Sequence, residues 1–123
     1  MTALKEKVTA LNELIISGHT LKAMQDFYSA NIEMQENEDI PLIGKTVCME
    51  HEKDNLQKIN TVESILLNQA VDEEKNVVFS EWQYLVTYKN NRKILLTEVS
   101  VQHWTEGLVT KEKFYYKSFQ EVD

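Results

Sequence analysis

The sequence contains few of the residues that interrupt or cross-link a polypeptide chain: one cysteine, one proline and three glycines among 123 residues. Because Cys48 has no second cysteine to pair with, an internal disulfide bond is excluded, which fits a reducing compartment. The scarcity of proline and glycine argues against disordered linkers. With 42% hydrophobic residues the chain can bury one core, and we expect a single domain over residues 1–123.

Positive charge and long apolar runs are also lacking. The 13 basic residues are outnumbered by 20 acidic ones, which gives a net charge of −7. Nucleic-acid binding draws much of its affinity from basic surface, so that class of partner is excluded. No apolar run approaches the roughly 20 residues that span a bilayer, and the first seven residues lack the apolar segment of a signal peptide. We therefore expect a cytoplasmic protein with no membrane partner.

Motifs that mark common cofactor and catalytic sites are missing as well. The sequence has no GxGxxG or P-loop glycine pattern, no GxSxG and no CxxC. Its three histidines stand outside zinc-binding patterns such as HExxH. We therefore predict no metal site and no cofactor.

The first half of the chain has the periodicity of helices. Apolar residues recur at spacings of three and four over residues 3–17, which predicts an amphipathic helix with Thr2 as its N-cap. A second, shorter helix is predicted with Thr20 as its cap. A third is predicted over residues 46–59, with Val47 on its apolar stripe. Between the last two, alternation over residues 32–36 predicts a short strand.

From Thr61 onwards the apolar period changes from 3.6 to 2. Four extended segments are predicted over residues 61–71, 76–88, 92–105 and 108–119. Their short connections predict antiparallel hairpins. Strands of this length must twist and bend, which creates a concave face. We therefore predict an α+β fold in which three N-terminal helices pack on the concave face of a strongly bent, mixed but mostly antiparallel sheet, a cone with a central pocket.

Alternation also predicts which side chains face that pocket. Lys111, Lys113 and Val109 share one face of the last strand, and the lysines mark this face as solvent-exposed. Glu112 is therefore predicted to point inward, as is Glu36 on the short first strand. Because burial raises the pKa of a carboxyl group, both are candidate general bases. The rest of the predicted lining is Trp82, Tyr84, Glu98, Gln102, Trp104, Phe114 and Tyr116.

Each of these residues also has an interpretation without a functional site. Glu112 can pair with a lysine or arginine on a neighbouring strand. Glu36 can simply face solvent beside the polar loop that follows it. The aromatic side chains can belong to an ordinary core, although pockets are lined by the same residue types.

Several segments resemble, in their order and spacing, the SnoaL-like members of the nuclear transport factor 2-like superfamily. The segments are FYSANIEMQEN (27–37), IGK (43–45), SEWQY (80–84), VQHW (101–104), GLV (107–109) and EKFYY (112–116). The resemblance implies an α+β cone with a pocket and a homodimer packed through the outer sheet face. It does not fix the function, because this superfamily contains cyclases, isomerases, dehydratases and binding modules.

One member of that superfamily allows a comparison of individual residues. Ketosteroid isomerase uses an aspartate as general base, with a tyrosine and a protonated aspartate as its oxyanion hole. In the alignment that the resemblance implies, Glu36 falls on the base position, whereas Leu11 and Val101 fall near the two donor positions. Because the oxyanion donors are missing, isomerisation by that same mechanism is disfavoured.

Three functions remain open from the sequence. The first is a module that binds a small apolar or aromatic molecule. The second is a cofactor-independent isomerase, cyclase or dehydratase in which Glu36 or Glu112 acts as general base. The third is a dimeric interaction module that uses an outer sheet face with Val77, Phe79 and Leu85.

Overall fold

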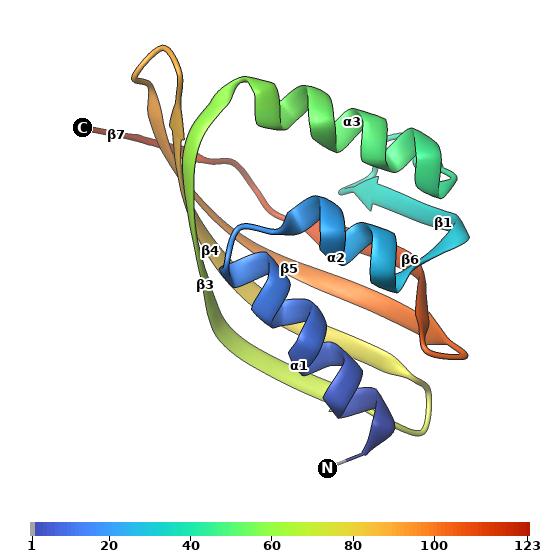
Figure 1. Ribbon diagram of the computed structural model, residues 1–123. Helices are drawn as coiled ribbons and strands as arrows, with labels where there is room; N and C mark the ends of the chain where they lie inside the picture. Colours follow the sequence, from blue (N-terminus) through green and yellow to red (C-terminus); the bar gives the residue numbers. More distant parts are fainter. Residues whose placement is uncertain (1) are drawn as a thin grey trace.

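The computed structural model describes residues 2–123, so Met1 of the expected domain lies outside the described residues. Helices dominate the first half and strands the second (Figure 1). In chain order the elements are α1 (Ala3–Ile16), α2 (Thr20–Phe27), β1 (Tyr28–Glu36), β2 (Leu42–Ile43), α3 (Lys45–Gln57), β3 (Ile59–Asp72), β4 (Val77–Tyr88), β5 (Lys93–Thr105), β6 (Leu108–Tyr115) and β7 (Gln120–Val122). No helix among residues 2–123 is both long and apolar enough to cross a bilayer.

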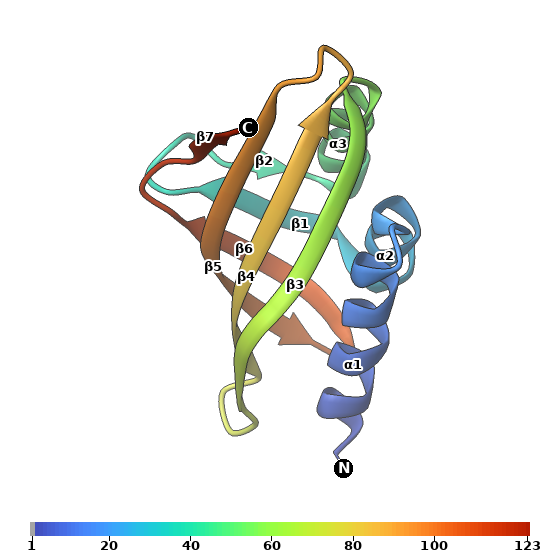
Figure 2. The ribbon, with the colours of Figure 1, turned by 90° about the vertical axis from the view of Figure 1, so that its left-hand side faces the viewer.

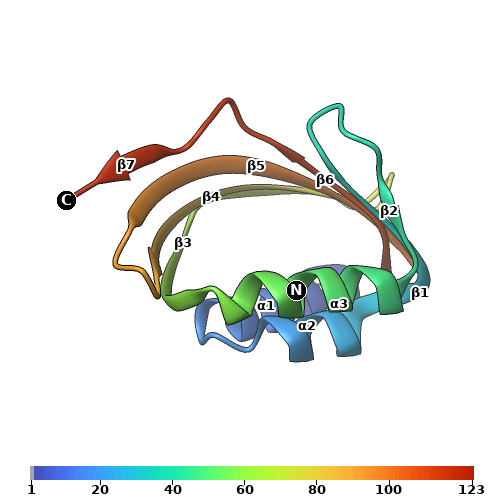
Figure 3. The ribbon, with the colours of Figure 1, turned by 90° about the horizontal axis from the view of Figure 1, so that it is seen from above.

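The strands form one strongly bent sheet in the order β2-β1-β6-β5-β4-β3. Neighbouring strands are antiparallel except for β1 and β6, which are parallel. Seen from above, β3, β4 and β5 arch over all three helices, which lie on the concave side (Figure 3). The opposite, convex side of these strands carries no helix (Figure 2). These features confirm the predicted fold class.

The helix predictions need small corrections. Thr2 caps α1 as predicted, because its Oγ1 accepts a hydrogen bond from the backbone N–H of Lys5 at 3.2 Å. Thr20 is the first residue of α2 rather than its cap. On α3 the buried residue is Cys48, while Val47 is about half exposed. The predicted apolar stripe of this helix was therefore wrong by one position.

The last predicted strand, over residues 108–119, is too long, and the short strand β7 that follows it was not predicted. β6 ends at Tyr115, and the chain then returns to the same edge of β5 as β7. A register shift between His103 and Trp104 pairs Trp104 with Val109. Because this irregularity reverses the alternation locally, Val109 is completely buried. The prediction that Val109 faces solvent was therefore wrong.

The main core lies between the first two helices and one end of the sheet. There the rings of Phe27 and Trp104 pack edge to face, with centroids 6.1 Å apart. The buried members of this core are Val8, Leu11, Ala23, Met24, Tyr28, Ile32, Cys48, Val78, Trp104 and Val109. The core therefore uses the beginning of β4 and the end of β5. The opposite ends of these strands arch over α3 and are free to line a cavity.

Candidate functional site

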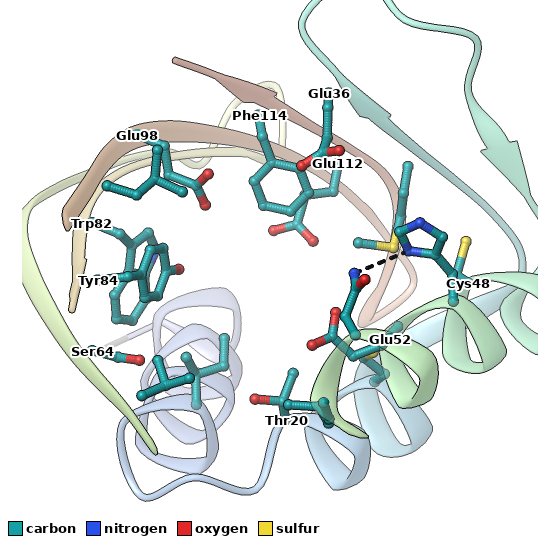
Figure 4. A pocket seen from close by; sticks show the side chains of 18 of the residues that line it. Thr20, Glu36, Cys48, Glu52, Ser64, Trp82, Tyr84, Glu98, Glu112 and Phe114 are labelled. Atoms are coloured by element: carbon teal, nitrogen blue, oxygen red, sulfur yellow. Dashed lines mark hydrogen bonds between the residues drawn. The ribbon is translucent and has the colours of Figure 1, made fainter. Parts of the chain in front are cut away.

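A cavity of about 630 Å³ lies between α3 and the concave face of the sheet (Figure 4). It falls within the size range of sites for small organic molecules. Its sheet wall is formed by residues of β3, β4, β5 and β6, and its other walls by α3, the end of β1 and the region around Thr20. The lining includes Tyr28, Glu36, Glu52, Ser64, Trp82, Tyr84, Leu96, Glu98, Gln102, Glu112 and Phe114.

Two aromatic rings on β4 form one wall. Trp82 and Tyr84 are two residues apart on the strand, so their side chains project from the same face. Their rings are stacked, with centroids 5.8 Å apart and an angle of 11° between the planes. This pair gives the cavity a broad apolar surface. Burial, followed by the charges of Glu98 and Glu112, raises the pKa of the Tyr84 hydroxyl, so it stays protonated and can donate a hydrogen bond.

Glu98 lies beside this aromatic wall. It is the direct cross-strand partner of Trp82, and Figure 4 shows its side chain directed into the cavity. The residue is only 8% exposed, and no residue in the range 2–123 forms a hydrogen bond or ion pair with its carboxyl group. Burial, reinforced by Glu112, Glu36 and Glu52, raises the pKa of Glu98 to about 8. Near neutral pH this group can therefore both hold and release a proton.

Glu112, in contrast, has partners on both oxygens. Tyr28 donates its hydroxyl to Oε1, and the Gln102 side-chain amide donates to Oε2 at 2.7 Å. Gln102 in turn accepts a hydrogen bond from Trp104 Nε1 at 3.1 Å. Burial raises the pKa of Glu112, and the hydrogen bonds from Tyr28 and Gln102 partly oppose that rise. The network fixes Glu112 in place without a lysine or arginine partner.

The remaining carboxylates approach from other elements. Glu36 ends β1 and lines the cavity, although the residue is exposed. Glu52 on α3 points into the cavity from the wall opposite Glu98 (Figure 4). Burial raises the pKa of Glu52, an effect that His51 opposes and Glu36 reinforces.

The structure brings most of the sequence-predicted site residues to this cavity but not all. Glu36, Trp82, Tyr84, Glu98, Gln102, Glu112 and Phe114 line it. Two others lie elsewhere. Trp104 is buried in the main core, because the end of β5 lies over α1 and α2. Tyr116 follows the end of β6, where burial and then Glu36 raise its pKa to about 12.

Sequence reasoning missed Glu52 and Tyr28. The spacing of Cys48, Glu52 and Leu56 was the available signal for Glu52, because residues four apart share one face of a helix. For Tyr28 the signal was weaker, because its partner Glu112 is 84 positions away.

Comparison with solved structures gives several close matches in fold. A candidate SnoaL-like polyketide cyclase from Mesorhizobium loti has a TM-score of 0.79 and 19% identity, covering 94% of this chain and 100% of that chain. A nuclear transport factor 2-like protein of unknown function from Burkholderia pseudomallei has a TM-score of 0.81 and 11% identity, with coverages of 95% and 92%. SalBIII, an epoxide hydrolase/cyclase-like enzyme with a role in pyran ring formation in the polyether salinomycin, has a TM-score of 0.81 and 14% identity, with coverages of 97% and 95%.

At these identities the likeness establishes the fold. The chain has the α+β cone of SnoaL-like and nuclear transport factor 2-like proteins, as the sequence resemblance implied. No protein-family model and no curated protein sequence matches the chain.

Proposed function

We propose that this protein binds a small organic molecule with an apolar or aromatic part in the cavity between α3 and the sheet. The observation that carries the proposal is the stacked pair of Trp82 and Tyr84, which forms one wall of a cavity of about 630 Å³. Aromatic rings offer large apolar contact areas to a ligand. A few polar groups in an otherwise apolar lining supply orientation.

The lining suggests how such a ligand is held. Its ring would lie against the aromatic wall, with Leu96 and Phe114 enclosing it from β5 and β6. Its polar group would meet Glu98, the buried cavity side chain without a hydrogen-bond partner among residues 2–123. The fold neighbours are consistent with this role, since one is a candidate polyketide cyclase.

A thermal-shift screen with aromatic and polyketide-like compounds tests the proposal, using two tryptophan variants of β3. Ser64→Trp places a large side chain in the cavity, whereas Glu63→Trp changes the adjacent residue on the other face of the strand. We expect at least one compound to raise the unfolding temperature of the wild type and of Glu63→Trp but not of Ser64→Trp. Uniformly flat shifts, or equal shifts in both variants, would contradict ligand binding in this cavity.

A second function, catalysis by proton transfer, is favoured by the state of Glu98. Its pKa of about 8 and its lack of a hydrogen-bond partner among residues 2–123 leave it available as an acid or base near neutral pH. Of the bases proposed from the sequence, Glu112 already accepts hydrogen bonds on both oxygens and Glu36 stands at the exposed end of β1. We therefore place Glu98 ahead of both as general base.

In this reaction the Glu98 carboxylate would accept a proton from a carbon next to a carbonyl group. The C–H electron pair would form the C=C bond of an enolate, and the carbonyl π pair would move to oxygen. The Tyr84 hydroxyl would donate a hydrogen bond to that oxygen. It would thereby take the role of the oxyanion donors of ketosteroid isomerase, near whose positions this chain has Leu11 and Val101. With a β,γ-unsaturated carbonyl substrate the enolate is a conjugated dienolate, and return of the proton at its γ-carbon completes an isomerisation. No cofactor takes part.

Exchange of the α-protons of 2-tetralone in heavy water, followed by NMR, tests this second function. We expect the wild type to accelerate the exchange and the rate to rise with pH through about 8, because the carboxylate is the active form. Glu98→Gln should abolish the acceleration. If Glu112→Gln abolishes it and Glu98→Gln does not, the base is Glu112 instead.

A further inference from the structure

The cavity gathers acidic side chains without any lysine or arginine beside them. Five carboxyl groups line it: Glu36, Asp39, Glu52, Glu98 and Glu112. None of the chain's 13 lysines and arginines is in the lining. Among residues 2–123, only His51 of the lining can carry positive charge. His51 is an exposed residue of α3 beside Asn55, which also lines the cavity.

The ion pairs of residues 2–123 all lie outside the cavity, and none of their acidic members lines it. The five pairs are Lys5–Glu73, Lys22–Asp26, Arg92–Glu121, Lys111–Glu33 and Lys113–Glu38. Five acidic residues outside the cavity are thus paired with the protein's own cations, whereas none of the five in the cavity has a lysine or arginine partner among residues 2–123. Negative charge confined to a low-dielectric cavity attracts positively charged ligands.

The arrangement of the carboxylates suits an extended molecule better than a single metal ion. No three histidine, cysteine or acidic side chains among residues 2–123 are grouped closely enough to hold a metal. Glu98 and Glu52 instead point into the cavity from opposite walls (Figure 4). Glu98 is only 8% exposed as a residue, and its carboxyl group has no hydrogen-bond partner within those residues, so its polar contact is left for a ligand.

We propose that the ligand is an organic cation, with an aromatic or apolar ring against Trp82 and Tyr84 and a protonated amine directed at Glu98. The proposal rests on the proposed binding function and specifies its ligand class. An ammonium group forms charge-assisted hydrogen bonds with a carboxylate, and it is also attracted to the faces of aromatic rings. A carboxylate or phosphate ligand would meet five acidic side chains in this lining and no lysine or arginine.

Binding of such a cation has a proton signature. In the free protein, burial and the facing carboxylates of Glu112, Glu36 and Glu52 keep Glu98 mostly protonated at pH 7. The hydroxyl of Tyr84 in the cavity and that of Tyr116 outside its lining both stay protonated at this pH. An ammonium group favours the carboxylate form of Glu98. Cation binding should therefore release a proton, whereas binding of a neutral molecule should not.

Isothermal titration calorimetry of the full chain with tryptamine, tryptophol and indole-3-propionate tests the ligand class. The three compounds share an indole ring and differ in charge. At pH 7 we expect tryptamine to bind about tenfold more tightly than tryptophol, the size of one charge-assisted hydrogen bond. Indole-3-propionate should bind most weakly. Titrations in two buffers with different ionisation enthalpies should reveal proton release for tryptamine alone.

Matched variants separate the role of Glu98 from that of the cavity. Glu98→Gln should weaken tryptamine binding to about the level of tryptophol and leave tryptophol unchanged. Glu63→Gln, on the other face of β3, should change neither. If tryptophol or indole-3-propionate binds the wild type as tightly as tryptamine, the cationic ligand class is overturned while the binding function stands. If none of the three binds, the ligand class is likewise overturned, and the thermal-shift screen decides separately whether the cavity binds other compounds.

Discussion

Trp82 on β4 and Glu98 on β5 are direct cross-strand partners, and both side chains face the same cavity. The pair places a large apolar ring next to a buried carboxyl group that has no hydrogen-bond partner among residues 2–123. Such a carboxyl group is costly to the fold in its charged form. This Glu98 carboxyl group therefore lowers the stability of the folded protein but is available to a ligand.

This cost predicts a pH dependence of stability. The pKa of Glu98 is raised from 4.5 to about 8 in the folded state, so between these values the folded protein holds a proton that the unfolded chain releases. Relative to Glu98→Gln, the wild type should be most stable below pH 4.5 and lose up to about 1.4 kcal/mol per pH unit until about pH 8. Urea unfolding of both proteins at several pH values measures this. A stability difference independent of pH would contradict the assigned state of Glu98.

The buried hydrogen bond between Tyr28 and Glu112 predicts a second stability effect. Tyr28→Phe removes the donor to one carboxyl oxygen and should destabilise the protein by about 1–3 kcal/mol. Tyr115→Phe removes a hydroxyl from a residue that is 45% exposed and should cost less than about 0.5 kcal/mol. Chemical denaturation of both variants makes the comparison, and equal losses would speak against a stabilising role for the Glu112 network.

The two tryptophans should respond differently to a ligand. Trp82 lines the cavity, whereas Trp104 is buried in the main core. A compound from the thermal-shift screen should therefore change the fluorescence of the wild type and of Trp104→Phe, but not of Trp82→Phe. Titrations followed by emission spectra measure this, and a response that disappears only in Trp104→Phe would place the ligand elsewhere.

The convex face of the sheet predicts self-association. Phe79, Val99 and Tyr115 are each more than one-third exposed on adjacent strands of this face, and the family resemblance implies a homodimer there. Light scattering at micromolar concentration should give twice the chain mass for the wild type and the chain mass for Phe79→Glu. Ile43→Glu, at an exposed position on β2, should remain dimeric. A wild type that is monomeric at this concentration would contradict self-association through the convex face.

Local patterns were sufficient to predict most of the fold. The alternation in β4 and β5 and the short turns between strands depend on neighbouring residues, so they are visible in the sequence. The parallel pairing of β1 with β6 joins distant segments and leaves no local signal. The register shift that buries Val109 and the departure of the chain after Tyr115 were missed because each interrupts an otherwise regular alternation.

The site was predicted in part for the same reason. Alternation placed Glu98 and Gln102 on one face of β5, and both line the cavity. It could not place Trp104 correctly relative to the cavity, because the same face of one strand serves the core at one end and the cavity at the other. Nor could it show that Glu112 is held by Tyr28 while Glu98 has no hydrogen-bond partner in the described part of the chain, since that difference arises from tertiary contacts.

The most direct test of the account is a crystal structure of the protein soaked with the compound that gives the largest thermal shift. The account predicts a ligand between α3 and the sheet, with its ring against Trp82 and Tyr84 and its polar group within hydrogen-bond distance of Glu98. A ligand bound outside the cavity, with the cavity filled by water alone, would contradict it.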